Sequence, residues 1–298
     1  MTPRKWPAAL IDSLSRQDCV VFLGAGFTKG AKTSGGRRPL GWNDLLTSLL
    51  DEIAPKSKRA SKPRAEIEKQ IKSGNLLWAA EQLQTMYKDN GLQSDLRNTI
   101  AGLVDGSGDN KFEPGKYHEY LEDLNPRVIF TTNYDKVLNR QFSNGGYNIL
   151  DYSSPAIATQ ICEGASVIIK IHGDINNPKD IIITKSDFSK LRYQGSRALS
   201  VLEALFLTRT FLFLGYSLSD PDIQLILENQ MMTSGPIGSH YILAHERSID
   251  NVRRRYFEKY YGVNVLTYRG DVQSGLEASL EQLVAKVGEN RLINQIDS

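Results

Sequence analysis

The sequence predicts an α/β protein whose core is a doubly wound, parallel β-sheet. Short runs of apolar, β-favouring residues recur along the chain, and each run ends in glycine or in a small polar cluster. Each run is followed by a segment with the apolar spacing of a helix, and this alternation is typical of right-handed βαβ units in a buried parallel sheet. The predicted strands are Cys19–Leu23, Val128–Thr131, Val167–Ile171, Phe211–Leu214, Tyr241–Leu243 and Val263–Thr267.

The segments between these strands carry apolar residues at spacings of three and four, as amphipathic helices do. Asp220 before Pro221 has the pattern of a helix N-cap, and Gly262 has the pattern of a helix end. The predicted helices are Trp42–Ile53, a group within Arg64–Leu103, Gly195–Leu207, Pro221–Met232, Ile249–Tyr261 and Leu276–Val287.

The length of 298 residues suits one large domain with a full hydrophobic core. We therefore expect a single Rossmann-like domain over residues 1–298, with a helical insertion at about residues 56–118, because Arg64 to Lys116 contains no convincing strand. A polar stretch from Ser143 to Gly164 is expected to form a lid or loop with one brief extended segment.

Composition narrows the class of protein. No apolar run approaches the roughly 20 residues of a membrane-spanning helix, and Met1–Leu10 lacks the apolar stretch of a secretory signal, so we expect a cytoplasmic protein without membrane contact. A net charge of +2 argues against direct nucleic-acid binding. The basic run Lys56–Arg64 indicates a solvated loop, with a patch for nucleic acid or an acidic partner as the alternative. Cys19 and Cys162 suit buried thiols in a reducing cell.

The first predicted strand runs directly into the small residues of Gly24-Ala25-Gly26-Phe27-Thr28. Glycine at this point allows a sharp turn, and it allows backbone N–H groups to approach a phosphate at a helix N-terminus. The full Gly-x-Gly-x-x-Gly pattern is absent, because Lys29 stands where the last glycine would be, so a simple tight turn is the alternative. The following Lys29–Gly41 would suit a mobile flap over an anionic cofactor.

Polar residues also follow three other strands. Thr132, Asn133 and Asp135 follow the predicted strand Val128–Thr131, and His172 follows the predicted strand Val167–Ile171. Asn133 or Asp135 could merely cap a helix, and a lone histidine at a strand end is more often structural. Carboxyl ends of parallel strands share one edge of the sheet, however, and ligands of open α/β sheets bind there. Because these residues and the glycine loop are all expected at the same edge of the sheet, we favour a functional site there.

A fourth polar segment runs from Gly215 to Asp222. Gly215 and Ser217 would let backbone and hydroxyl groups approach a ribose, while Asp220 is more simply a helix cap, and both uses can coexist.

In these four segments the chain resembles the Sir2-like family, over about Asp18 to Tyr268 without the insertion. Gly24-Ala25-Gly26 resembles the phosphate loop of the family, and Thr132-Asn133-Tyr134-Asp135 resembles its Gln-Asn-x-Asp element, with Thr132 in the place of Gln. Ile171-His172-Gly173 resembles its catalytic His-Gly, and Gly215-Tyr216-Ser217-Leu218 resembles its ribose-binding Gly-Thr-Ser-Leu.

Two departures narrow what the resemblance implies. The deacetylases of the family hold zinc with four cysteines, whereas this chain has two, and the Pro-Asp-Phe-Arg element after the glycine loop is replaced by Arg37–Trp42. In these two departures the chain resembles the bacterial Sir2-like proteins that hydrolyse NAD in antiphage defence. The resemblance implies NAD+ as substrate, no metal, a regulatory protein partner encoded nearby, and a homo- or hetero-oligomer.

The resemblance also implies roles for single residues. His172 is the expected general base, Asn133 would position the attacking water or a ribose hydroxyl, and Asp135 would favour the ribosyl cation or fix Asn133. The residues expected to bind the cofactor are Gly24, Ala25, Gly26, Phe27, Thr28, Thr132, Gly215 and Ser217. The alternatives are an NAD-dependent protein deacylase, and a non-catalytic subunit that senses NAD or another nucleotide. The product, ADP-ribose or a cyclic form, is open.

Overall fold

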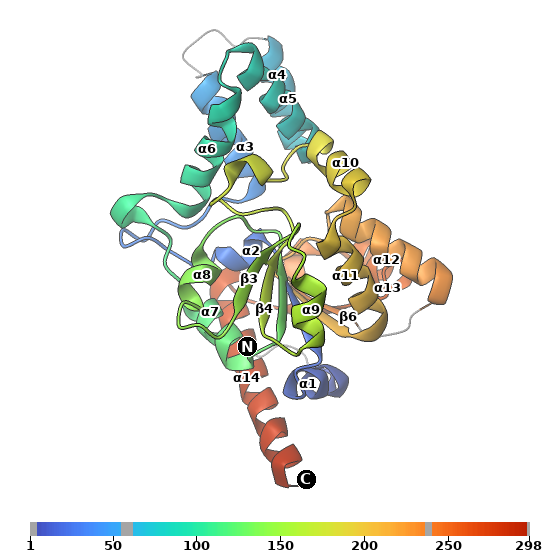
Figure 1. The fold of residues 1–298 in the computed structure, drawn as a ribbon. Helices are drawn as coiled ribbons and strands as arrows, with labels where there is room; N and C mark the ends of the chain where they lie inside the picture. Colours follow the sequence, from blue (N-terminus) through green and yellow to red (C-terminus); the bar gives the residue numbers. More distant parts are fainter. Residues whose placement is uncertain (1–4, 55–61, 236–239, 297–298) are drawn as a thin grey trace.

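A parallel sheet of seven strands forms the core of the protein (Figure 1), in a computed structural model that describes residues 5–54, 62–235 and 240–296. The strands are β1 (Cys19–Leu23), β2 (Val128–Thr131), β3 (Asn148–Asp151), β4 (Val167–Lys170), β5 (Thr210–Leu214), β6 (His240–His245) and β7 (Val263–Tyr268). Every strand pair is parallel, which confirms the predicted sheet. The strand order is β3-β4-β2-β1-β5-β6-β7.

This order places the point where the chain reverses direction across the sheet at β1. From β1 the chain builds β2, β3 and β4 on one side, then returns to build β5, β6 and β7 on the other. In open α/β sheets the ligand crevice lies outside the carboxyl ends of the strands at such a switch point. The fold therefore predicts a ligand site at the loops that follow β1, β2, β4 and β5.

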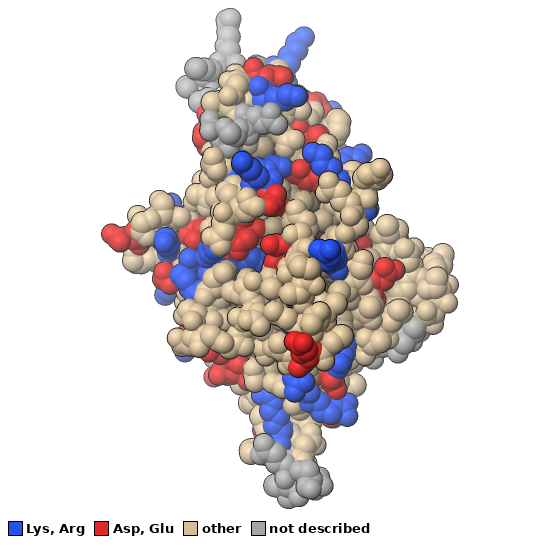
Figure 2. All heavy atoms as spheres, viewed as in Figure 1, with Lys and Arg blue, Asp and Glu red and all other residues tan. Residues whose placement is uncertain are grey.

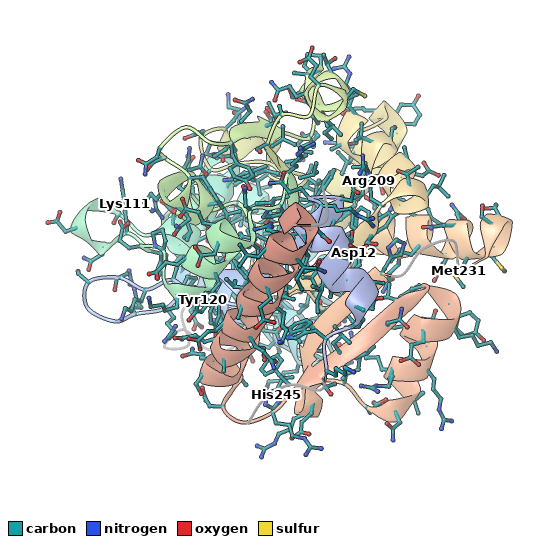
Figure 3. All side chains as sticks on the ribbon, turned by 90° about the horizontal axis from the view of Figure 1, so that it is seen from below. Asp12, Lys111, Tyr120, Arg209, Met231 and His245 are labelled. Carbon is teal, nitrogen blue, oxygen red and sulfur yellow. The ribbon has the colours of Figure 1, made fainter. Side chains whose placement is uncertain are left out.

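Helices cover both faces of the sheet. Successive side chains of a strand point to opposite faces, so Val21 and Leu23 pack into one core while Val20 and Phe22 pack into the other. The first face is covered by α1 (Ala8–Ser15), α7 (Lys116–Leu124), α8 (Val137–Gln141) and α14 (Val272–Ile296). Seen from below, α14 runs between α1, which carries Asp12, and α7, which carries Tyr120 (Figure 3).

The second face is covered by α9 (Ile157–Cys162), α11 (Arg197–Thr208), α12 (Pro221–Ser234) and α13 (Asn251–Tyr260). Burial of apolar surface on both faces explains why the central strands read as continuous hydrophobic runs rather than as alternating ones. The N-cap at Asp220 is confirmed, because its Oδ1 accepts the backbone N–H groups of Asp222 (2.9 Å) and Ile223 (3.3 Å).

A third hydrophobic core belongs to a cluster of four helices that lies over the carboxyl edge of the sheet (Figure 1). These helices are α3 (Trp42–Ile53), α4 (Lys62–Lys72), α5 (Leu76–Asp89) and α6 (Gln93–Asp105), and we call them the helical cluster. Its core also contains Tyr134 from the loop after β2, and Ile181 and Ile183 from the segment after β4. The helical cluster is thus packed directly onto the loops that carry the predicted site.

The stretch Ser143–Gly164 contains β3, an edge strand with exposed and half-buried residues, where one brief extended segment was expected. The short helix α9 in the same stretch was not predicted. The helix α10 (Lys185–Gln194) also has no counterpart among the predictions. Its amphipathic signal is weak, and it begins with a capping box in which Thr184 Oγ1 accepts the N–H of Asp187 at 3.1 Å.

Two expectations about single residues were wrong. Cys162 is exposed, because it ends the short surface helix α9, although Cys19 is buried as predicted. Arg64 is not part of a solvated loop: it lies in α4 and is buried, where its guanidinium pairs with Asp51 and Glu68. Lys62 of the same run is exposed at the start of α4, and Lys56, Lys58 and Arg59 lie outside the described residues.

Charges of both signs are interspersed on the face shown in Figure 2, as the near balance of the composition suggests. Among the described helices, none combines the length and the apolar character that crossing a membrane requires.

Candidate functional site

The loops after four neighbouring strands continue in register. Thr131 of β2 pairs with Leu23 of β1 and with Lys170 of β4, so Asn133 and His172 each lie two residues beyond paired positions on adjacent strands. The ladder extends one residue past the strands, since the N–H of Thr132 donates to Leu23 O (3.2 Å) and that of Ile171 to Thr131 O (2.9 Å). Adjacent strands lie about 4.8 Å apart. The fold therefore brings Asn133 and His172 side by side at the sheet edge.

The glycines of the first loop are required by close packing against the loop after β5. A Cβ on Gly24 would lie 2.6 Å from Gly215 O, and one on Gly26 would lie 2.7 Å from the same oxygen. Gly215 has φ of +59° and a Cβ there would lie 2.1 Å from Phe27 N. Because the N–H of Gly26 donates to Gly215 O (2.9 Å), part of the expected phosphate cradle is occupied by the protein itself.

A chain of hydrogen bonds joins three predicted site residues. The amide Nδ2 of Asn133 donates to Gly24 O (3.1 Å) and to Thr28 Oγ1 (2.6 Å), and the Thr28 hydroxyl donates to Asp135 Oδ2 (3.2 Å). The second oxygen of Asp135 accepts the N–H of Val137 (3.0 Å), which forms a turn before α8. The N-cap residue of α8 is Lys136, and no side chain caps the helix, so the alternative in which Asn133 or Asp135 caps it is not confirmed. Both amide hydrogens of Asn133 are engaged, which leaves its Oδ1 to accept a hydrogen bond from a ligand.

The catalytic candidates are well covered. The residues Asn133, Asp135 and His172 are 9%, 6% and 6% exposed. Burial raises the pKa of the Asp135 carboxyl above its ordinary value, although nearby Lys170 acts in the opposite direction. A charged carboxylate is costly in such surroundings unless a cation or several donors face it.

His172 faces a carboxylate that the sequence presented only as a helix cap. Its Nε2 lies 2.8 Å from Asp220 Oδ2, and both side chains are buried. In this conformation Asp220 Oδ2 accepts no hydrogen bond from the described residues, so the contact is a close approach of imidazole and carboxylate rather than an aligned bond. Phe188 of α10 packs edge-on against the imidazole ring at a centroid distance of 5.0 Å.

The backbone around the His172–Asp220 contact adopts conformations with positive φ. Gly173 has φ of +89°, and a Cβ there would lie 2.5 Å from Asp180 O, so glycine is required beside the histidine. Leu218 has φ of +51° although it is not glycine, and its side chain is fully buried in the second core. Strain of this kind persists only where packing holds it in place. The turn at Leu218 delivers Asp220 to the histidine.

The remaining predicted cofactor-binding residues occupy several environments. Phe27 is buried in the first core and packs against Tyr117 and His118, so its side chain does not face the edge. Ala25 and Thr132 are half-buried at the edge. Ser217 is exposed, its hydroxyl lies 2.7 Å from that of Ser219, and its carbonyl accepts a hydrogen bond from Arg253 Nη2 (3.0 Å).

Sequence reasoning missed two charged residues of this site. Asp220 was interpreted as a cap alone, because its contact with His172 spans a distance in sequence that no local pattern reports. Lys170 is buried at the end of β4, and its ammonium contacts the loop after β2. A lysine inside an otherwise apolar strand run, Val167–Ile171, was the available signal, since lysine is almost never buried without a partner.

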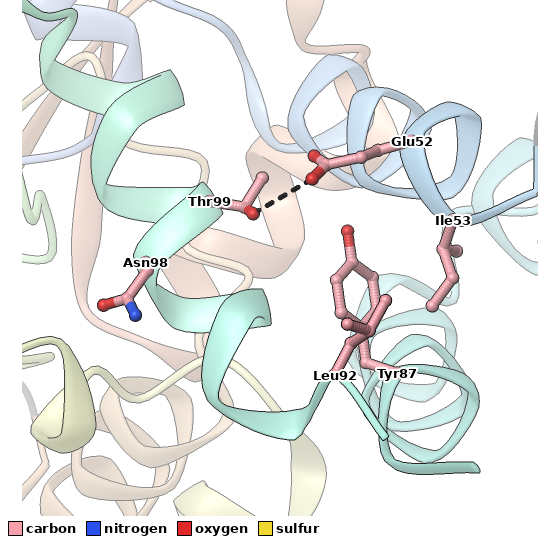
Figure 4. A pocket seen from close by; sticks show the side chains of 6 residues that line it. All are labelled: Glu52, Ile53, Tyr87, Leu92, Asn98 and Thr99. Carbon is pink, nitrogen blue, oxygen red and sulfur yellow. Dashed lines mark hydrogen bonds between the residues drawn. The ribbon is translucent and has the colours of Figure 1, made fainter. Parts of the chain in front are cut away.

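Two pockets lie away from these residues. One of about 500 Å³ is in the helical cluster, where Thr99 donates to Glu52 near Tyr87 and Leu92 (Figure 4). The other, of about 490 Å³, lies between α12 and α13, and it is lined by Leu218 and Ser219 of the Ser217 loop and by Arg253 of α13. The described part of the chain has no group of three or more His, Cys, Asp or Glu side chains placed to hold a metal ion.

Known proteins with similar sequences include NAD(+) hydrolases and a sirtuin. An NAD(+) hydrolase ThsA of Enterococcus faecium is 27% identical over 73% of this chain and 41% of its own length, and that of Cytobacillus dafuensis is 24% identical over 78% and 42%. The defense-associated sirtuin 2 of Bacillus subtilis is 24% identical over 37% of this chain and 11% of its own length. The chain thus spans about two fifths of the length of these NAD(+) hydrolases.

A family model described as the SIR2-like domain matches residues 127–266. This range includes the Asn133 loop, the His172 turn and the Gly215–Asp222 segment, which are three of the four segments at the sheet edge. The parallel sheet agrees with this match, and residues 127–266 are similar to a SIR2-like domain.

Proposed function

We propose that this protein cleaves the nicotinamide–ribose bond of NAD+. The observation that carries the proposal is the placement of His172 and Asn133 at equivalent positions beyond two adjacent strands, next to the switch point of the sheet. Relatives named NAD(+) hydrolases match over about three quarters of the chain, and they support the choice of substrate.

The proposed reaction begins with departure of nicotinamide, which takes the electron pair of the broken C–N bond and leaves an oxocarbenium-like ribosyl cation. Water adds to this cation, and one proton is released for each NAD+ consumed. His172 would accept the proton from the attacking water or from a ribose hydroxyl, a step that commonly contributes about 10²–10⁴-fold. The carboxylate of Asp220 beside Nε2 would stabilise the imidazolium that results.

Asn133 and Asp135 would act on the ribose side of the same edge. The free Oδ1 of Asn133 would orient a hydroxyl or the water, because its amide hydrogens are held by Gly24 and Thr28. Asp135 would support Asn133 through Thr28 and would favour positive charge on the ribose. The cofactor would be held by the loops that contain Gly24, Ala25, Gly26, Phe27, Thr28, Thr132, Gly215 and Ser217.

The biological setting forms a further part of the proposal. The matched proteins include a defense-associated sirtuin, and we propose a role as a cytoplasmic effector of antiphage defence. Because constant NAD+ loss would kill the host, the activity requires an off-state, which a regulatory partner or an oligomeric assembly would supply.

The direct test is product analysis in water enriched in ¹⁸O. The purified protein is incubated with NAD+, alone and together with the proteins encoded by neighbouring genes. The reaction products are separated by chromatography, and their masses are measured by mass spectrometry. Hydrolysis predicts nicotinamide together with ADP-ribose that carries one ¹⁸O, whereas a cyclic product would carry none. An acetylated peptide forms the second arm of the experiment: nicotinamide release only in its presence would identify a deacylase. Tight NAD+ binding in calorimetry with no product in any arm would identify a sensor and contradict the proposal.

A further inference from the structure

Lys170 is a buried cation between the two loops of the proposed site. It is the last residue of β4, it pairs in register with Thr131 of β2, and it is 1% exposed. Its ammonium donates to Asp135 O and to Asp174 Oδ2, both at 2.5 Å, and lies 3.5 Å from Tyr134 O. All three acceptors lie in the loops that bear Asn133 and His172.

The partners of Lys170 come from two different loops. Asp135 is two residues after Asn133, and Asp174 is two residues after His172. An ammonium ion loses its hydration when it is buried, so it is stable only while several acceptors remain around it. Any movement of one loop away from the other would leave this charge short of partners, and the structure therefore couples the positions of the two loops.

The electrostatics of Asp174 support the same conclusion. Burial acts to raise the pKa of this carboxyl, but Lys170 and the N–H of Asn176 more than offset burial and hold the pKa below its ordinary value. Its Oδ1 accepts that N–H at 2.7 Å and lies 3.3 Å from Lys136 Nζ at the outside of the site. Asp174 is therefore fixed in the turn directly after the His172-Gly173 pair.

We propose that Lys170 is a positioning residue for nicotinamide–ribose cleavage, which holds Asn133 and His172 at their mutual distance without touching the substrate. This inference rests on the proposed function. A misplacement of reacting groups by about 1 Å can cost on the order of 10²-fold in rate, so a bridge of this kind has a measurable effect on turnover.

The test compares Lys170→Met with Lys136→Met, because both variants remove a cation from Asp174. Lys136 is the outer partner and is 21% exposed, whereas Lys170 is the inner bridge. We expect Lys170→Met to lower kcat by about 10²-fold with NAD+ affinity nearly unchanged, while Lys136→Met stays within about twofold of the wild type. Amide hydrogen exchange of residues 134–136 and 173–176 is expected to accelerate in Lys170→Met alone.

Several outcomes would overturn the inference. They are wild-type kcat in a folded Lys170→Met, equal losses in both variants, or unchanged exchange in the two loops. If Lys170→Met fails to fold, Asp174→Asn decides, because it weakens the bridge while keeping an oxygen acceptor: a lower kcat supports the inference and wild-type kcat contradicts it. A wild-type protein that never releases nicotinamide refutes the proposed function, and the exchange measurement then still reports on the bridge itself.

Discussion

Asp220 shows how one side chain serves the fold and the proposed chemistry at once. Its Oδ1 begins α12 by accepting two backbone N–H groups, and its Oδ2 lies against the imidazole of His172. The N-terminus of α12, where the positive end of the helix dipole lies, therefore faces this carboxyl group. The sequence predicted the cap, because capping is a local pattern, but the pairing with His172 depends on the sheet that brings β4 and β5 to the same edge.

Asp220→Asn separates these two tasks. Asparagine caps helices as well as aspartate does, so we expect α12 and the thermal unfolding temperature to change little. Loss of the charge beside His172 is expected to lower kcat/KM for NAD+ by about 10–100-fold, since the imidazolium loses its counter-ion.

Asp250→Asn is the matched control for this substitution. Asp250 caps α13 by the same kind of bond, to the N–H of Arg253 at 2.7 Å, and it has no contact with His172. Equal rates for the two variants would show that the Asp220 charge has no part in catalysis.

At the scale of elements, the helical cluster is attached to the site through α10. Arg97 of α6 makes two hydrogen bonds to the carboxylate of Asp187, at 2.8 and 2.9 Å, and Glu81 of α5 accepts from the N–H and hydroxyl of Ser186 at 2.8 and 2.6 Å. The same α10 places Phe188 against His172. The helical cluster therefore controls the position of the helix that covers the proposed general base.

Arg97→Ala tests this attachment. The variant leaves Asp187 without its cation in a largely buried place, and breaking a buried pair in this way costs about 3–5 kcal/mol of unfolding free energy. We also expect slower nicotinamide release, because Phe188 and α10 lose their anchor. The measurements are urea unfolding and the NAD+ assay.

Arg16→Ala serves as control, since it removes the exposed pair with Asp12 and should be nearly neutral. A variant at Arg97 as stable as the Arg16 control would refute the proposed attachment.

The elements differ in how well sequence could predict them. Central strands such as β1 and β2 were predicted with their observed bounds, because both faces are buried and the apolar run is continuous. The edge strand β3 lacks that signal, since its residues are exposed or half-buried. The helix α10 was missed because it is mostly polar. It buries the apolar side chains of Phe188 and Leu191, and its Asp187 also pairs with Arg97 of the helical cluster.

At the scale of the whole molecule, the sequence predicted the sheet and the edge of the site, but not what lies over that edge. The packing of the helical cluster on Tyr134, Ile181 and Ile183 joins residues from three separate stretches of chain. No periodicity within a single segment encodes such contacts. The close packing of Gly24 and Gly26 against Gly215 was missed for the same reason, since each glycine alone is compatible with a phosphate loop.

Buried His118 makes the stability of the whole molecule depend on pH. Burial lowers its pKa from 6.5 to about 4, and its neutral Nδ1 accepts the N–H of Gly115 at 3.1 Å. The unfolded chain takes up a proton at pH values where the folded protein does not. This contribution to stability is therefore complete above about pH 6.5 and is lost as the pH falls toward 4.

The difference in stability between the wild type and His118→Gln separates the contribution of His118 from the contributions of the other titrating groups. Because glutamine does not titrate, the advantage of the wild type in unfolding free energy should shrink by about 2 kcal/mol between pH 7 and pH 5. Urea unfolding at a series of pH values gives the result. A constant difference across that range would mean that His118 is not held neutral by the fold.

The central claim, that His172 acts as general base in NAD+ cleavage, is tested most directly by the rate of nicotinamide release from the wild type and from His172→Ala. Both proteins are assayed by chromatography, alone and with the products of neighbouring genes, and thermal unfolding verifies that the variant is folded. We predict release by the activated wild type and a loss of about 10²–10⁴-fold in the variant. Full turnover by a folded His172→Ala would contradict the claim.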